Sequence, residues 1–130
     1  MGIDAGFDLY PPLTDSDVDK CTWEAFLEEV KNEYQSDSAV TIDTMGRIEF
    51  TVGEHPTLSK HGHLFRRFSS KISGSHAQNV EVYLHEVGVI ATRYFGYRIH
   101  HWSELSGGGH EIYGWKEVHA ASAAERALED

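Results

Sequence analysis

The segment from Val80 to Gly96 constrains the fold more than any other part of the sequence. Apolar side chains recur there at helical spacing, which predicts one long helix with a single apolar stripe. Ser75 followed by Gln78 fits a capping box at its start, and Gly96 is of the type that ends helices. Such a helix must bury its stripe against another layer of structure. The stripe comprises Val80, Tyr83, Leu84, Val87, Ile90, Ala91, Tyr94 and Phe95.

A second helical stripe lies nearer the start of the chain. It follows three aspartates, whose negative charge suits the positive end of a helix. Its apolar residues recur at the same spacing and predict a first helix that packs on the same core. The aspartates are Asp15, Asp17 and Asp19, and the stripe comprises Trp23, Phe26, Leu27, Val30 and Tyr34.

Alternating runs of apolar and polar residues predict the strands that these helices cover. One run covers residues 3–9 and stops before Pro11 and Pro12. Residues 40–42 and 48–52 form two more runs, joined by a loop that contains Gly46, and they predict a hairpin. Further along the chain, the predicted elements are a strand at residues 64–70, a hairpin formed by residues 97–102 and 111–115, and a helix at residues 117–130.

This order of elements predicts a single α+β domain over residues 1–130. We expect an antiparallel sheet of about four to six strands, with two main helices packed on one face and a C-terminal helix. A ferredoxin-like split βαβ arrangement, elaborated between residues 53 and 75, fits the first six elements. An open roll is the alternative topology.

Charge and cysteine content exclude several classes of protein. The formal net charge of -10 repels nucleic acid phosphates and anionic membrane surfaces, so we expect neither as a partner. The single cysteine, Cys21, cannot form a disulfide within the chain, which favours the cytoplasm. The first residues include Asp4 and Asp8 rather than a basic apolar leader, and no apolar run is long enough to span a membrane. No motif calls for a cofactor.

The distribution of charge is more informative than its sum. Residues 1–54 hold 13 acidic and 3 basic residues, whereas residues 55–80 hold 4 basic residues and no acidic residue. An even spread would place about four acidic residues in that middle segment. The segment also holds four of the nine histidines and leads directly into the long helix.

We interpret this segment as a binding site for an anionic small molecule that carries a phosphate, sulfate or carboxylate group. The start of a helix has unpaired N–H groups and a partial positive charge, and both attract anions. Arginine forks and a lysine point charge would add to the attraction. The serine and glycine spacing lacks that of a nucleotide P-loop. The candidate residues are Arg66, Arg67, Lys71, Ser73, Gly74, Ser75 and His76.

Two further interpretations remain open. In one, the basic segment pairs electrostatically with the acidic first helix, within the fold or in a homodimer. In the other, the acidic helix docks a basic protein partner, as inhibitor and immunity proteins do. The acidic residues concerned are Asp15, Asp17, Asp19, Glu24, Glu28, Glu29 and Glu33.

Histidines in the middle segment suggest chemistry of a third kind. His61 and His63 can present two imidazoles on one side, and with His55 or Glu54 they would make a zinc site of a metal enzyme. The sequence holds no HExxH motif to support this. His76 is the candidate for a catalytic proton shuttle, because an imidazole beside an anion site can act as a base near neutral pH.

Aromatic and acidic side chains complete the set of candidates. If the C-terminal hairpin aligns Trp102 with Tyr113 and Trp115, it forms a wall on which a flat ring or a sugar would stack, although core packing explains the same residues. Asp4 and Asp8 share one face of the first strand but lie too far apart for a catalytic pair. A glycine between them, Gly6, leaves room for a ligand.

Overall fold

The computed structural model of this chain describes residues 3–64 and 67–103. In chain order the helices and strands are β1 (Ile3–Leu9), α1 (Asp17–Tyr34), β2 (Val40–Ile42), β3 (Ile48–Phe50), β4 (Thr57–Leu58), β5 (Arg67–Ile72), α2 (Ala77–Phe95) and β6 (Ile99–Ser103). Short 3₁₀ turns cover Lys60–Leu64, Gly74–His76 and Gly96–Arg98. This architecture, with two main helices and antiparallel strands, confirms the α+β prediction.

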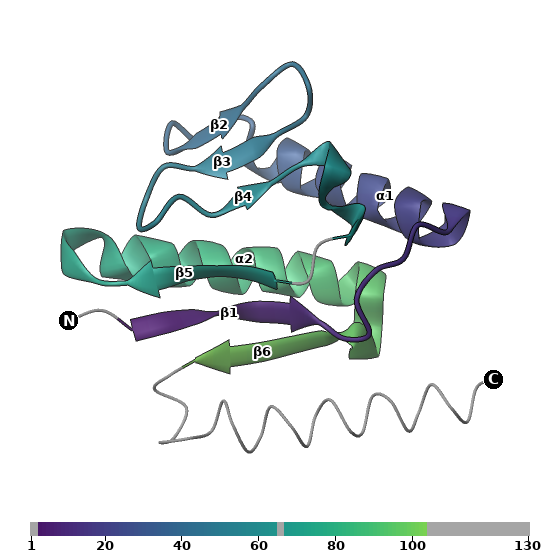
Figure 1. Ribbon diagram of the computed structural model, residues 1–130. Coiled ribbons are helices and arrows are strands. Elements are labelled where there is room, and N and C mark those ends of the chain that lie inside the picture. The colour runs from purple at the N-terminus through teal and green to yellow at the C-terminus, as the bar shows by residue number, and fades with distance from the viewer. Residues whose placement is uncertain (1–2, 65–66, 104–130) are drawn as a thin grey trace.

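β1 is the central strand of a three-stranded antiparallel sheet with the order β5-β1-β6. Alternation along β1 turns Phe7 and Leu9 toward the core, where both are buried, and turns Asp4 and Asp8 toward the opposite face. In Figure 1 the three strands lie side by side and α2 runs along the sheet behind them. α2 therefore covers the apolar face of this sheet.

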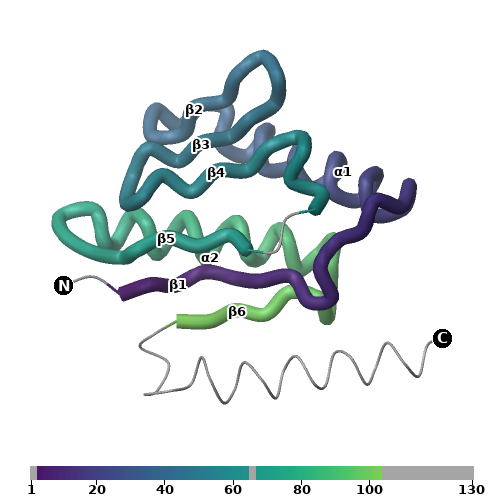
Figure 2. Tube along the Cα trace, in the orientation of Figure 1, coloured from purple at the N-terminus to yellow at the C-terminus, as the bar shows by residue number. Residues whose placement is uncertain are grey.

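β2, β3 and β4 form a second, smaller antiparallel sheet. The predicted hairpin is present: Val40 pairs with Phe50 and Ile42 with Ile48, and Gly46 in the connecting loop has a left-handed φ of 82°. Figure 2 shows this sheet above β5, apart from the three strands of the first sheet. The ring centroids of Phe50 and Phe68 lie 5.6 Å apart and connect the two sheets through the core.

The division into two sheets differs from a ferredoxin-like arrangement, which would join β1 and the β2–β3 hairpin in one sheet. β5 and β6 occupy both sides of β1 instead. The predicted strand at residues 64–70 corresponds to β5, shifted toward the C-terminus. The predicted C-terminal helix and the second strand of the C-terminal hairpin, residues 111–115, lie outside the described residues.

Each of the two helices has a recognisable residue at one of its ends. Ser16, which the sequence analysis does not single out, caps α1 by accepting a hydrogen bond from the Asp19 backbone N–H at 3.2 Å. α2 ends at Gly96, as predicted, with a φ of 55°. Among the described helices, none is both long and apolar enough to cross a membrane.

The predicted cap at Ser75 is wrong. α2 begins at Ala77, its N-cap residue is His76, and no side chain caps it. The reason lies one residue before Ser75: Gly74 takes a left-handed φ of 66°, and the chain then makes a 3₁₀ turn before the α-helix starts. Ser75 therefore lies inside that turn instead of at its edge.

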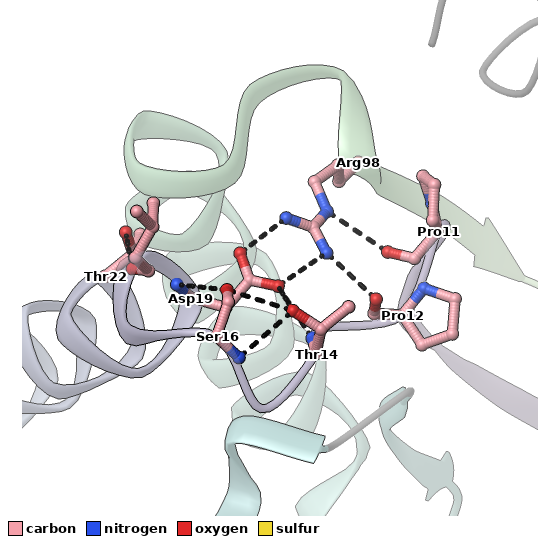
Figure 3. Close-up of polar contacts among 8 residues, drawn as sticks. Pro11, Pro12, Thr14, Ser16, Asp19, Thr22 and Arg98 are labelled. Atoms are coloured by element: carbon pink, nitrogen blue, oxygen red, sulfur yellow. Dashed lines mark hydrogen bonds and ion pairs between the residues drawn. The ribbon is translucent and has the colours of Figure 1, made fainter. Parts of the chain in front are cut away.

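A buried ion pair ties the start of α1 to the start of β6. Arg98 donates from Nη1 to Asp19 Oδ1 at 2.9 Å, and its other nitrogens donate to the carbonyl oxygens of Pro11 and Pro12. Thr14 donates to the same carboxylate from its backbone N–H and its hydroxyl. Figure 3 shows Arg98, Thr14 and Ser16 around Asp19, with the carbonyl oxygens of Pro11 and Pro12 on the other side of the Arg98 guanidinium.

Candidate functional site

The turn between β5 and α2 contains four of the predicted ligand-binding residues. Ser73, Gly74, Ser75 and His76 are all exposed. Neither the 3₁₀ turn nor α2 receives a side-chain cap, and the first turn of α2 contains no acidic residue. The backbone N–H groups at the start of α2 therefore create a positive potential, and no described side chain caps them.

Gly74 keeps the approach to this turn open. A methyl group at its Cβ position would have no heavy atom within 4 Å, apart from its chain neighbours. The left-handed φ of 66° also makes glycine the favoured residue here. The bare backbone at Gly74 would let an oxyanion come close to the N–H groups of the turn.

Lys71 precedes Ser73 by two residues, and alternation along β5 places its side chain on the face of the sheet opposite α2. It lies near the end of β5, opposite Asp4 of β1, and is half-buried. Despite that register, its ammonium group forms no ion pair with a described residue within 4.0 Å. Its charge is thus available to a ligand, with Asp4 as the nearest carboxylate in the strand register.

Arg67 does not form a site with Lys71, although the sequence analysis predicts that both belong to one anion-binding site. Arg67 binds Asp8 through two hydrogen bonds, from Nε at 3.0 Å and from Nη2 at 3.3 Å. The two basic residues are also four positions apart on β5, which corresponds to about 13 Å along a strand. Its charge is therefore used inside the fold, and the second predicted arginine, Arg66, lies outside the described residues.

Arg67 instead joins the predicted stacking residue. Its guanidinium lies 4.9 Å from the centre of the Trp102 ring, and Trp102 donates its indole N–H to Asp8 Oδ1 at 3.0 Å. The other two members of the predicted aromatic wall, Tyr113 and Trp115, lie outside the described residues. Sequence spacing offered one signal for this cluster: Asp8 and Arg67 each stand on the polar face of an alternating strand.

Gly6 has a structural role that the sequence did not show. A Cβ atom there would lie 2.6 Å from Ser69 Cα and would also overlap the Phe68 carbonyl oxygen. The β5 backbone therefore occupies the space beside Gly6 that the sequence analysis predicts to be open to a ligand. Close approach of the two strands, and not access to a site, explains this glycine.

A turn missed by sequence reasoning packs against the beginning of α2. Gly53 has a φ of 61°, and a Cβ atom there would lie 2.7 Å from Ser70 Oγ and 2.9 Å from Val80 Cγ2. Its neighbour Glu54 donates its backbone N–H to the buried Ser70 hydroxyl at 3.0 Å. Next in the chain, His55 holds a left-handed φ of 57°, which is uncommon for a residue with a side chain. In Figure 1 this β3–β4 turn and the start of α2 lie at the same end of the molecule.

The two predicted metal ligands, His61 and His63, have different surroundings. His63 Nε2 lies 3.0 Å from Asp15 Oδ1, whereas His61 is exposed on the same 3₁₀ turn. Hydrogen bonds from Lys20 and His63 lower the pKa of Asp15. Within residues 3–64 and 67–103, no three histidine, cysteine or carboxylate side chains are arranged to hold a metal ion.

His76, the predicted proton shuttle, is exposed at the N-cap position of α2. No hydrogen bond joins its ring to another described residue. A base needs an orienting partner or a reacting group within hydrogen-bonding reach, and the described residues supply neither. His76 therefore contributes to this site as a polar neighbour of the turn.

The acidic residues of the first helix divide into two groups. Asp19 is buried with Arg98, Asp15 contacts Lys20 and His63, and Glu29 pairs with Arg93 and Tyr94, so these carboxylates serve the fold. The second group is exposed and has no ion pair with a described residue. It comprises Asp17, Glu24, Glu28 and Glu33.

Comparisons with known proteins leave the function to be argued from these residues. No model of a protein family matches the chain, and neither curated proteins nor solved structures include a match.

Proposed function

We propose that this protein binds a small anionic molecule, carrying a phosphate, sulfate or carboxylate group, at Lys71 and the turn Ser73–His76. One observation carries the proposal: the 19-residue helix α2 starts without a side-chain cap, a few residues after a lysine that has no ion pair with a described carboxylate. Because helix starts are usually capped by Ser, Thr, Asp or Asn, an uncapped one preceded by an unpaired cation supports binding of an external anion.

The two groups would contribute in different ways. The backbone N–H groups at the start of α2 give directional hydrogen bonds, and the helix dipole adds a partial positive charge. Lys71 acts as a mobile point charge that tolerates several oxyanion geometries. The proposed site therefore recognises charge and the tetrahedral or planar shape of an oxyanion, and the rest of the ligand is set by neighbouring surfaces.

Titration with small anions tests this function directly. Backbone amide signals of the ¹⁵N-labelled protein would be followed while phosphate, sulfate or citrate is added at constant ionic strength, with chloride as the reference. We expect the largest shifts at Ser73 to Ala77. A uniform response to all salts, or shifts elsewhere with none in this turn, contradicts the proposal.

Three variants separate the contribution of Lys71 from general charge effects. Lys71→Met should weaken anion binding about tenfold, because one charge-assisted contact is lost. Lys60→Met is the matched control: this exposed lysine has no ion pair with a described residue and lies in another segment. Asp4→Asn should strengthen binding, since it removes the carboxylate opposite Lys71 in the strand register.

A second candidate function is docking of a basic protein segment on α1. A groove of about 300 Å³ lies between α1 and the β2–β3 turn, where Glu24 and Glu28 stand one helical turn apart and Met45 is 71% exposed. Lys31 and Lys60 also line this groove, so it carries both signs of charge. The carboxylates would attract a basic side chain while Met45 packs on its aliphatic stem. Binding of an arginine-rich peptide that weakens with salt and with Glu24→Gln plus Glu28→Gln supports docking, and the anion site should remain unaffected.

We place either function in the cytoplasm, because the free Cys21 implies no need for an oxidising compartment.

A further inference from the structure

An open pocket, called the cavity below, lies between α2 and the strands β1 and β6. Its volume of about 150 Å³ is enough for about one six-membered ring, and Glu81, His85 and His101 in its lining are exposed to solvent. Ala5, Ile72 and Leu84 give it apolar walls, and its polar groups include Glu81, His85 and His101. None of its described lining residues is a lysine or an arginine.

The His101 ring can pack closely against α2 because the helix has a glycine, Gly88, at the point of contact. A Cβ atom on Gly88 would lie 2.5 Å from His101 Cε1 and 3.1 Å from its Nδ1. Glycine inside a helix costs about 1 kcal/mol relative to alanine. The chain thus carries a destabilising residue in its longest helix, and the consequence is room for an imidazole ring beside the cavity.

The hydrogen bonds of Thr92 indicate which ring nitrogen of His101 accepts. The Thr92 hydroxyl donates its hydrogen to the Gly88 carbonyl oxygen at 2.8 Å. Its oxygen, 3.5 Å from His101 Nε2, then offers only lone pairs to the ring. This arrangement favours the tautomer with the proton on Nε2, which leaves a lone pair on Nδ1.

The charge state of His101 agrees with this role. Burial lowers the pKa of the His101 imidazole, and the neighbouring His85 and His100 lower it further. A lowered pKa favours the neutral form of the ring. Together with the Glu81 carboxylate, the cavity offers hydrogen-bond acceptors and negative charge next to aliphatic walls.

We propose that this cavity binds a primary ammonium group attached to an apolar body about the size of one six-membered ring. The Glu81 carboxylate pairs with the ammonium group, His101 Nδ1 accepts one of its hydrogens, and Ala5, Ile72 and Leu84 contact the apolar body. This ligand has the opposite charge to the anion proposed at Lys71 and contacts other side chains, so probes of opposite charge distinguish the two proposals.

Three probes of similar shape and different charge test the proposal. Benzylammonium, benzyl alcohol and benzoate would each be titrated into the full chain, with binding followed by amide shifts and by the ¹⁵N shifts of the His101 ring. We expect benzylammonium to bind most tightly, benzyl alcohol more weakly and benzoate not at all. Shifts should fall on Ala5, Leu84 and His101, away from Ser73 to Ala77. Equal affinity for benzoate, or no response at His101 Nδ1, overturns the proposal.

Variants locate the two polar contacts. Glu81→Gln should weaken benzylammonium binding about tenfold and leave benzyl alcohol nearly unchanged, because only the charged contact is lost. Asp17→Asn on α1 is the matched control, because this exposed carboxylate lines neither the cavity nor the groove at Glu24, and it should change neither. His101→Leu should reduce binding of both probes. Gly88→Ala displaces the same ring without removing it, so it should also weaken both; wild-type affinity in that variant, once its folding is verified by circular dichroism, contradicts the proposed role of His101.

Discussion

Arg98 and Asp19 form a nearly solvent-free ion pair across 79 positions of the chain. Two guanidinium nitrogens contact the two carboxylate oxygens at 2.9 and 3.3 Å, and the side chains are only 14% and 11% exposed. The arginine also satisfies the carbonyl oxygens of Pro11 and Pro12. The pair thus fixes the path from β1 into α1, which the apolar core alone leaves undetermined.

Removing the arginine of this pair should destabilise the protein strongly. Arg98→Met leaves the Asp19 carboxylate buried without its cation, and we expect the free energy of unfolding to fall by about 3 kcal/mol or more. Urea denaturation measures the change. Arg47→Met, which breaks an exposed pair with Glu49, is the control and should cost less than about 1 kcal/mol. Similar losses in both variants would show that the Arg98 pair contributes no more than a surface contact.

The same pair predicts how stability depends on pH. Burial alone would raise the pKa of Asp19, but hydrogen bonds from Arg98 and Thr14 outweigh it and lower that pKa from 3.8 to about 2. Because the folded value lies below the unfolded one, the stabilisation is complete above pH 4 and is lost as the pH falls toward 2. Linkage gives a loss of about 2 kcal/mol.

Unfolding free energies between pH 5 and pH 2.5 measure this effect. The lowered pKa of His101 also affects stability below its ordinary value of 6.5, but it does so in both proteins, so the difference between the wild-type and Asp19→Asn profiles reports on Asp19. Asp19→Asn is less stable at pH 5 and should show a flatter profile in this window. A wild-type profile parallel to that of Asp19→Asn would exclude Asp19 as the titrating group.

Periodicity in the sequence was sufficient for the elements with long or regular patterns. The stripe from Val80 to Phe95 corresponds to α2, and the two short runs around Gly46 form the β2–β3 hairpin. These patterns report which face of an element is buried, and that is a local property of the chain. β4 escaped notice because a strand of two residues has no period to detect.

Pairing between distant segments could not be read from the same patterns. β1 alternates in a way that fits several sheet partners, and only the structure shows β5 and β6 beside it. For the candidate site, the sequence located the exposed turn Ser73–His76 but assigned Arg67 to a ligand. Asp8, 59 positions away, binds that arginine instead, and no local rule indicates such a contact.

The Asp8–Arg67 contact predicts a change in the environment of one tryptophan. Asp8→Asn keeps the size of the side chain but removes the charge that orients Arg67 and accepts the Trp102 N–H. We expect the variant to lose about 1–3 kcal/mol of stability, as for hydrogen bonds to charged groups. In an ¹H-¹⁵N spectrum the Trp102 indole signal should move, while that of Trp23, which donates to the Ser59 carbonyl oxygen, should stay in place. An unmoved Trp102 signal would mean that Asp8 does not hold this ring.

Gly6 gives the sharpest test of the packing of β1 on β5. An alanine there would push its methyl group into the β5 backbone, 2.6 Å from Ser69 Cα, and a backbone cannot swing aside as a flexible side chain can. We expect Gly6→Ala to cost about 3 kcal/mol or more in urea denaturation. Gly46→Ala is the matched control: its φ of 82° disfavours alanine, but the space around its Cβ position is empty, so a loss of about 1 kcal/mol is expected. If Gly6→Ala were as mild as the control, the two strands would have to separate freely at this position, and Lys71, which depends on β5 for its position opposite Asp4 and before the Ser73–His76 turn, would not be held where anion binding requires it.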